Sequence, residues 1–344
     1  MALLDLYDSV VYNHEDVACD KTGVGLYKTT PHKDRLVGVA YTTWHTPTRP
    51  WWGTGTWDVP LYGPYYSDDE KVIRYHGELL RDAGVDFVFV DWSNNTPYDP
   101  PTMRGQKRAD LQMIEEATDR LFDVWATIEG APKICIFVGP GHAGPANIPN
   151  GRQDAKVAQV WRDYVTHPTR SHMYFHYEGK PLLVCYGATP TQYTADPYSL
   201  WNDDRFTVRW ITGYVAQQAG LSDPVTLRSH CYWSWEERGA QTYTVLGDRV
   251  EAVTVSASWR PQGEPGEDWY IPAGPRADGA TLKMQFQRAC DLGARIVLVV
   301  SWNEWTTSEQ LSVDISKDIE PSQIHGTFYY DLMREQIKKF KGLI

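Results

Sequence analysis

Eight short runs of apolar, often β-branched residues recur along the 344-residue chain, and most are separated by segments long enough for a helix. Such runs are typical of strands buried on both faces, as in a parallel sheet. Eight alternating strand and helix units predict a (β/α)8 TIM barrel in the α/β class, with a doubly wound open sheet as the alternative. The runs lie in residues 35–45, 86–93, 133–139, 180–187, 206–214, 231–237, 252–259 and 294–300.

The segments between these runs carry helix signals. Ser67 followed by Glu70 forms a capping-box pattern, and Gly84 is a suitable stop for the helix that begins there. Apolar spacing predicts further helices over residues 109–129, 154–167, 198–203, 279–292 and 326–341. No internal repeat of 20–50 residues is present, so a repeat array is excluded. We expect one domain, with residues 1–35 as an N-terminal extension packed on a barrel of residues 36–344.

Tryptophan and tyrosine are unusually frequent, with 15 Trp and 21 Tyr against 9 Phe. Both combine a flat apolar face with a polar group, which suits a pyranose ring with its C–H patches and hydroxyls. The alternative is that they fill a large core. Residues 46–64 form a Trp-rich stretch that is too long for a simple connector, so we expect long aromatic loops that shape a cleft.

Charge and composition exclude several classes of partner. The net charge of −11 argues against a nucleic-acid backbone, which needs a basic surface. No apolar segment reaches 18 residues, so no membrane span is expected. The N-terminus lacks the basic start and apolar core of a signal peptide. We therefore expect a cytoplasmic protein, or a secreted or periplasmic one if a signal peptide has been removed. The oligomeric state is not indicated.

The sequence also lacks the motifs of several enzyme classes. No G-x-G-x-x-G follows the first strand, and there is no P-loop, no G-x-S-x-G and no H-E-x-x-H. The five cysteines are scattered without a C-x-x-C pair, which favours reduced thiols over a disulfide framework. We expect neither a cofactor nor a metal.

The last strand ends in the sequence Trp302-Asn303-Glu304-Trp305. A carboxyl group between two indoles at the end of a buried strand is costly to ionise unless a partner compensates. A protonated carboxyl near neutral pH is what a general acid needs. The alternative is a Glu that caps a turn or pairs with an Arg. We predict that Glu304 is a catalytic acid/base.

Active sites of (β/α)8 barrels lie where the strands end. Asp91 ends the second strand, and Glu236 or Glu237 follows the sixth, with Glu236 preferred as a catalytic residue. Two carboxylates in an aromatic cleft suit glycoside hydrolysis, although the same set can bind a sugar without cleaving it. The predicted substrate-binding residues are Tyr41, Trp44, His45, Trp92, His142, Tyr186, Tyr214, Trp233, Trp235, Trp259, Trp302, Asn303, Trp305 and Glu309.

The motif 301–305 resembles glycoside hydrolase family 99 and its relatives, the family 71 α-glucanases and the WbsX-like proteins of bacterial polysaccharide loci. The residues that support it elsewhere are Val90-Asp91-Trp92, Asp318-Ile319-Glu320-Pro321, His325-Gly326, Tyr329-Tyr330 and Phe340-Lys341. The resemblance implies a (β/α)8 barrel that hydrolyses α-linked glycans. It also implies a pair of carboxylates on the last strand and loop, one assisting through the sugar 2-hydroxyl and the other acting as acid/base.

This chain departs from the family pattern at the second carboxylate. Glu304 matches the first, but Thr307 stands three residues later, and the next carboxylate is Glu309. The partner of Glu304 is then Glu309, Asp91 or Glu236, or the activity is lost or changed. The alternatives to a hydrolase are a glycan-binding barrel without catalysis and another carbohydrate-active barrel enzyme, such as a lyase.

Overall fold

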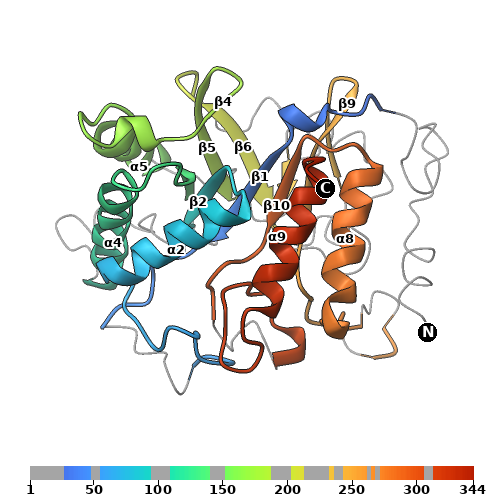
Figure 1. Ribbon diagram of the computed structural model, residues 1–344. Helices are drawn as coiled ribbons and strands as arrows, with labels where there is room; N and C mark the ends of the chain where they lie inside the picture. Colours follow the sequence, from blue (N-terminus) through green and yellow to red (C-terminus); the bar gives the residue numbers. More distant parts are fainter. Residues whose placement is uncertain are drawn as a thin grey trace.

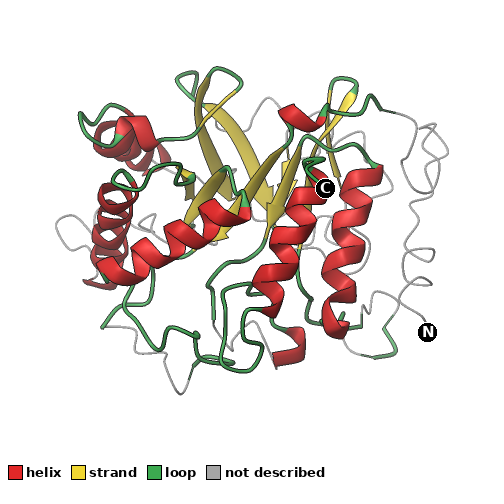
Figure 2. Ribbon diagram, in the orientation of Figure 1, coloured by secondary structure: helices red, strands yellow, loops and turns green. Residues whose placement is uncertain are grey.

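A curved, mainly parallel sheet lies at the centre of the computed structural model, and the helices pack around its outside (Figures 1 and 2). The sheet is a nearly closed barrel, which confirms the predicted TIM-barrel class. The structure describes residues 27–47, 55–93, 109–139, 152–186, 203–212, 232–235, 243–261, 265–267, 272–305 and 313–344.

The strands follow the order β7-β6-β5-β3-β2-β1-β10-β9-β8 around the barrel. All neighbours in this path are parallel except β8 and β9. The eight parallel strands are β1 (Leu36–Tyr41), β2 (Phe87–Trp92), β3 (Lys133–Val138), β5 (Lys180–Tyr186), β6 (Thr207–Thr212), β7 (Tyr232–Ser234), β9 (Arg249–Val255) and β10 (Ile296–Val299). Each lies within or overlaps one of the eight apolar runs, so those predictions are confirmed.

Two short strands were not predicted. β8 (Tyr243–Leu246) pairs antiparallel with β9, and β4 (His176–Tyr177) forms a hairpin with β5. Strands of two and four residues are too short to show a periodic pattern.

The helices confirm most of the sequence expectations. In Figure 1, α2 crosses in front of β1 and β2, while α8 and α9 lie side by side and α8 packs against β9. The expected helix at 198–203 lies almost wholly outside the described residues. The helices are α2 (Glu70–Ala83), α4 (Ala109–Trp125), α5 (Arg152–Val160) with a π turn at Trp161–Val165, α8 (Ala280–Asp291) and α9 (Phe328–Phe340).

The start of α2 differs from the prediction. Its N-cap is Asp69, whose side chain accepts a hydrogen bond from the Lys71 amide at 2.9 Å. Ser67 instead accepts a hydrogen bond from the His45 amide at 3.1 Å, so a tertiary contact has taken its hydroxyl away from the helix. Gly84 closes the helix as expected, with a φ of 83° that favours glycine.

Alternate residues of each strand face either the barrel interior or the helices. On β2, Phe87 and Phe89 face inward, and Phe89 reaches Trp235 with ring centroids 5.9 Å apart. Gly38 of β1 lies opposite Phe87, and a Cβ there would lie 2.4 Å from its ring. The outward residues of β2 meet the helix layer, where the Trp92 indole donates to Thr118 of α4 at 2.9 Å.

Side chains bridge the seam between β7 and β9. Glu251 of β9 is 2% exposed and accepts hydrogen bonds from Arg209 of β6 at 2.6 Å, from Tyr177 of β4 at 3.0 Å and from Trp233 of β7 at 3.0 Å. A buried carboxylate with a guanidinium and two further donors is well compensated. This cluster ties four strands together near the start of β9.

Replacing Glu251 by Gln removes the only negative charge of this cluster among the described residues and leaves the buried Arg209 cation without it. We expect a destabilisation of about 3 kcal/mol, measured as a lower urea midpoint, because breaking a buried ion pair exposes its desolvation cost. Glu335→Gln, in an exposed pair with Lys339, is the control and should leave the midpoint unchanged. Equal midpoints for both variants would contradict the assigned role of Glu251.

The loops that follow β1 and β10 meet at the carboxyl ends of the strands, at the lower edge of the view in Figure 1. The Leu61 amide donates to the Pro321 carbonyl at 2.7 Å, and the Gln323 amide donates to the Val59 carbonyl at 2.9 Å. These main-chain bonds hold the two loops together where a barrel enzyme carries its site.

Candidate functional site at the strand ends

The end of β10 is fixed to the end of β1 by hydrogen bonds. The Trp302 amide donates to the Ala40 carbonyl at 2.8 Å. The Asn303 side chain accepts from the Thr42 amide at 2.8 Å and donates to the Thr42 carbonyl at 3.1 Å and to the Tyr65 hydroxyl at 3.2 Å. The Asn303 side chain therefore has a structural role here, because its amide group hydrogen-bonds Thr42 and Tyr65 and links the ends of β10 and β1.

Glu304 follows Asn303 and forms a buried ion pair with Lys317. Its Oε2 lies 2.8 Å from Lys317 Nζ and 3.4 Å from the Ser301 hydroxyl, and both charged side chains are 3% exposed. An ammonium group at this distance stabilises a carboxylate relative to the neutral acid. Lys317 is thus the compensating partner of a carboxyl group whose burial alone favours protonation.

Aromatic rings lie beside this ion pair inside the barrel. Lys317 Nζ is 5.8 Å from the centroid of Trp235, which follows β7. The Trp235 ring lies 5.2 Å from Phe137 of β3, and Phe137 lies 6.1 Å from Tyr186, the last residue of β5. A chain of contacts therefore joins three predicted site residues at the strand ends. It runs from Glu304 through Lys317 to Trp235, and from Trp235 through Phe137 to Tyr186.

Trp44 and His45, just past β1, contact the same turn through its main chain. The Trp44 indole donates to the Glu304 carbonyl at 3.3 Å, and His45 Nε2 donates to the Asn303 carbonyl at 2.9 Å. Burial lowers the pKa of His45 to about 4, an effect that the Asn303 bond and the Glu320 carboxylate only partly oppose. His45 is therefore a neutral imidazole near neutral pH, held by its ring nitrogen against the turn.

Three predicted substrate-binding residues, Tyr41, Trp92 and Trp302, face the helices in this structure, and their role in binding stays a prediction. Tyr41 hydrogen-bonds His76 of α2 at 2.9 Å, Trp302 packs edge-on against His76, and Trp92 donates to Thr118 of α4. The physical reason is strand alternation: Asp91 and Trp92 are neighbours, so they cannot point to the same face.

Three further tryptophans are buried with partners within the protein. Trp233 donates to Glu251, and Trp259 donates to the Pro272 carbonyl at 3.1 Å. Trp305 is fully buried and donates from its indole to Glu320 at 2.6 Å. In this structure the polar group of each of these indoles is therefore used within the protein, and Trp233 belongs to the Glu251 cluster.

Of the remaining candidates, only Asp91 lies in the described part of the chain. Asp91 ends β2 on its inward face, is 8% exposed and accepts from the Ser93 amide at 2.7 Å. Four predicted residues lie outside the described part of the chain, namely Glu236, Glu309, His142 and Tyr214.

The segment Lys317–Glu320 contributes charged residues that the sequence reading had not placed in the site. Asp318 accepts from the amides of Glu304 and Trp305 at 2.7 and 2.8 Å. Glu320 accepts from His76, Tyr65 and the Trp305 indole at 2.6–2.8 Å. The signal for them in the sequence is the alternation of Asp318 and Glu320 around the apolar residue Ile319.

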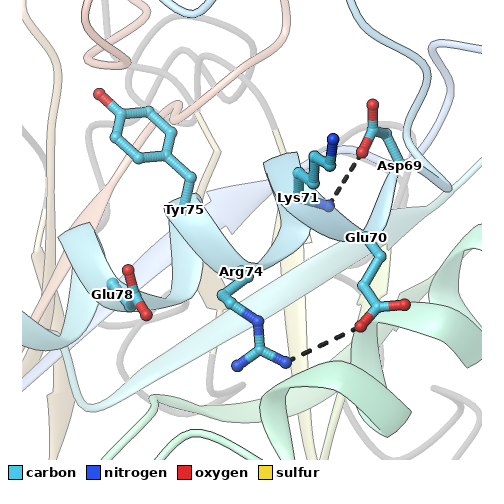
Figure 3. A pocket seen from close by; sticks show the side chains of 6 residues that line it. All are labelled: Asp69, Glu70, Lys71, Arg74, Tyr75 and Glu78. Atoms are coloured by element: carbon cyan, nitrogen blue, oxygen red, sulfur yellow. Dashed lines mark hydrogen bonds and ion pairs between the residues drawn. The ribbon is translucent and has the colours of Figure 1, made fainter.

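A separate concavity lies on the surface of α2. It has a volume of about 470 Å³, and Figure 3 shows that its lining side chains come from the N-terminal part of this helix and its cap. Its polar contacts are those of a solvated helix, because Asp69 caps the helix and Arg74 pairs with Glu70 at 3.8 Å. The lining residues are Asp69, Glu70, Lys71, Arg74, Tyr75 and Glu78.

Neither a metal cluster nor a membrane helix is found in the described part of the chain. No group of three or more His, Cys, Asp or Glu side chains there is arranged to hold a metal ion. None of the described helices is both long and apolar enough to cross a bilayer.

Comparisons with known proteins identify the fold. The sequence matches no protein-family model and no curated protein. Two solved structures of the family 99 endo-α-mannosidase from Bacteroides thetaiotaomicron are similar to it, one of them in complex with bis-tris propane. The complex has a TM-score of 0.59 at 16% identity, and the other a TM-score of 0.58 at 15%. Each comparison covers 90% of this chain and 98% of the other. The fold is therefore family 99-like, as the sequence motifs indicated.

The depressed pKa of His45 predicts a pH-dependent stability. The unfolded state binds a proton near pH 6.5, whereas folded His45 does so only near pH 4. Neutral His45 therefore does not reduce the stability of the folded state well above pH 6.5. As the pH falls from 6.5 to 4, the unfolded state takes up a proton that the folded state does not, and the free energy of unfolding decreases. Between pH 7 and pH 4, wild type should lose about 3 kcal/mol more stability than His45→Gln. Urea unfolding of both proteins at the two pH values measures this, and parallel losses would refute it.

Proposed function

We propose that this protein is a glycoside hydrolase that cleaves a glycosidic bond in an oligo- or polysaccharide, with Glu304 as a catalytic carboxylate. The observation that carries the proposal is the buried Glu304–Lys317 pair beside Trp235 at the strand ends of the barrel. Charged groups excluded from water and flanked by aromatic rings suit a site that binds a sugar ring and acts on its anomeric centre. The family 99-like fold supports an α-linked glycan as the substrate.

The pairing with Lys317 favours an ionised Glu304, and this refines the role expected from the sequence. An ionised carboxylate serves as a base, for example toward a sugar hydroxyl or a water molecule, or as a nucleophile. The proton for the leaving oxygen then comes from a second carboxyl group, for which Asp91, Glu236 and Glu309 remain the candidates. A separation of about 5–5.5 Å from Glu304 goes with retention, and roughly 6.5–9.5 Å with inversion.

Replacing Glu304 by Gln should abolish nearly all turnover, because the amide neither accepts a proton nor attacks carbon. Mass spectrometry of products from a panel of α- and β-linked oligosaccharides measures this. The matched control is Glu115→Gln, since Glu115 forms an equally close buried pair with Lys156 at 2.7 Å in the helix layer. Glu115→Gln should keep wild-type turnover per folded molecule. Turnover by Glu304→Gln at the wild-type rate would refute the catalytic assignment.

Replacing Lys317 by Met tests whether Glu304 acts as a base or as an acid. Removing the ammonium disfavours the carboxylate, so protonation of Glu304 should occur at higher pH. If Glu304 is the base, the acidic limb of the kcat/KM profile moves to higher pH. If only the alkaline limb moves, Glu304 is the general acid. Lys156→Met is the control, and its profile should match wild type.

A glycan-binding protein without catalysis is the second candidate. It is favoured by Thr307, which stands where the family pattern has its second carboxylate. In that case wild type and Glu304→Gln should both bind an oligosaccharide in titration calorimetry, and neither should release products. Detection of cleavage by wild type excludes this candidate.

A further inference from the structure

We propose that Asp318 is a positioning residue that sets the direction of Glu304 by holding the main chain of the turn that carries it. The proposal rests on the proposed function, because it concerns the same site. It follows from the hydrogen bonds that the buried Asp318 carboxylate accepts.

Four donors from the described residues converge on the two carboxylate oxygens of Asp318. The Ser301 hydroxyl and the Glu304 amide donate to Oδ1 at 2.5 and 2.7 Å. The Trp305 amide and the Trp57 indole donate to Oδ2 at 2.8 Å each. Asp318 itself is 1% exposed, so these donors are used in place of water. The carboxylate therefore fixes both peptide N–H groups that flank the Glu304 side chain.

The main chain of Asp318 is itself held firmly. The Ile319 amide donates to the Ser301 carbonyl at 3.0 Å, and the Glu320 amide donates to the Trp302 carbonyl at 3.0 Å. The Arg276 guanidinium donates to the Asp318 carbonyl at 2.7 Å. Asp318 can therefore act as a fixed reference for the turn after β10.

The turn needs such a support because Trp305 has a φ of 59°, in the left-handed region that non-glycine residues rarely adopt. Its ring stacks on Trp57 with centroids 4.8 Å apart, and its indole donates to Glu320. Asp318 binds the Trp305 amide and the Trp57 indole at once, so it joins the backbone to the ring stack. Loss of this carboxylate frees the turn to relax.

Glu304 and Lys317 meet because of this arrangement. Lys317 directly precedes Asp318 in the chain. Lys317 Nζ contacts the Glu304 carboxylate, and Asp318 Oδ1 accepts from the Glu304 main-chain amide. One short segment thus fixes both the backbone and the charged end of Glu304. A displacement of about 1 Å of a reacting group can cost a factor of about 100 in rate.

Asp318→Asn is the sharpest test. The size is kept, but the amide nitrogen is a donor and cannot accept a hydrogen bond. In the place of Oδ1 it loses the bond from the Glu304 amide, and in the place of Oδ2 it loses the bonds from the Trp305 amide and the Trp57 indole. We expect kcat to fall by about 100-fold, with KM changed by no more than a few-fold. The matched control is Glu251→Gln, another buried carboxylate with several donors, which contacts neither Glu304 nor the turn. Its kcat per folded molecule should equal that of wild type.

Two results with folded Asp318→Asn overturn the proposal. One is a wild-type kcat, with or without a change in KM. The other is a loss of kcat that Glu251→Gln reproduces by the same factor, because that indicates general loosening of the barrel. If Asp318→Asn does not fold, Trp57→Phe decides, since it removes one donor and keeps the stacked ring. A several-fold loss of kcat supports the proposal, and an unchanged kcat contradicts it.

A separate readout distinguishes failure of this proposal from failure of the proposed function. If wild type cleaves no glycan, crystal structures of wild type and Asp318→Asn are compared. Loss of the 2.8 Å contact between Glu304 and Lys317 in the variant supports positioning by Asp318. An unchanged contact contradicts it, whatever the protein binds.

Discussion

The burial of both faces of the strands is the constraint on which the rest of this structure depends. Residues such as Val88 and Phe89 are completely buried, one toward the helices and one toward the barrel interior. Polar groups are costly in such strands unless they are paired, so most of the chemistry is displaced to the strand ends. Glu251 is a charged residue inside such a strand, and Arg209 compensates its charge. The site around Glu304 is a consequence of where the apolar run of β10 stops.

The same constraint explains which predictions succeeded. Each parallel strand carries a local signal, because burial on both faces demands a continuous apolar run. Glu304 and Asp91 could be placed at strand ends for the same reason. The sequence does not show which way each residue at a strand end points. Asp91 and Trp92 are both predicted site residues, but alternation sends Asp91 inward and Trp92 toward Thr118.

The partners of Glu304 could not be predicted, for a different reason. Lys317 and Asp318 lie 13 and 14 residues beyond it, and the sequence between them and Glu304 shows no regular apolar period. No local pattern encodes that their side chains return to the end of β10. The start of α2 shows the same effect on a smaller scale, because Ser67 serves the His45 amide and leaves Asp69 as the cap. Tertiary hydrogen bonds decide such cases, and propensity does not.

Two buried Lys–Glu pairs show why position must be weighed with chemistry. Glu115–Lys156 and Glu304–Lys317 are similarly short and similarly buried. Neither is strong evidence for stability, because desolvation offsets most of the attraction between buried charges. The first is also satisfied by Gln159 and lies between α4 and α5, where Lys156 stands over the outward ring of Trp92. The second lies inside the barrel, where Lys317 stands over Trp235 and the Glu304 backbone is held by Asp318. The backbones of both pairs are anchored, the first by the helices α4 and α5 and the second by Asp318. What differs is the place in the fold, because only the second pair lies among the strand ends, where barrels of this kind carry their sites.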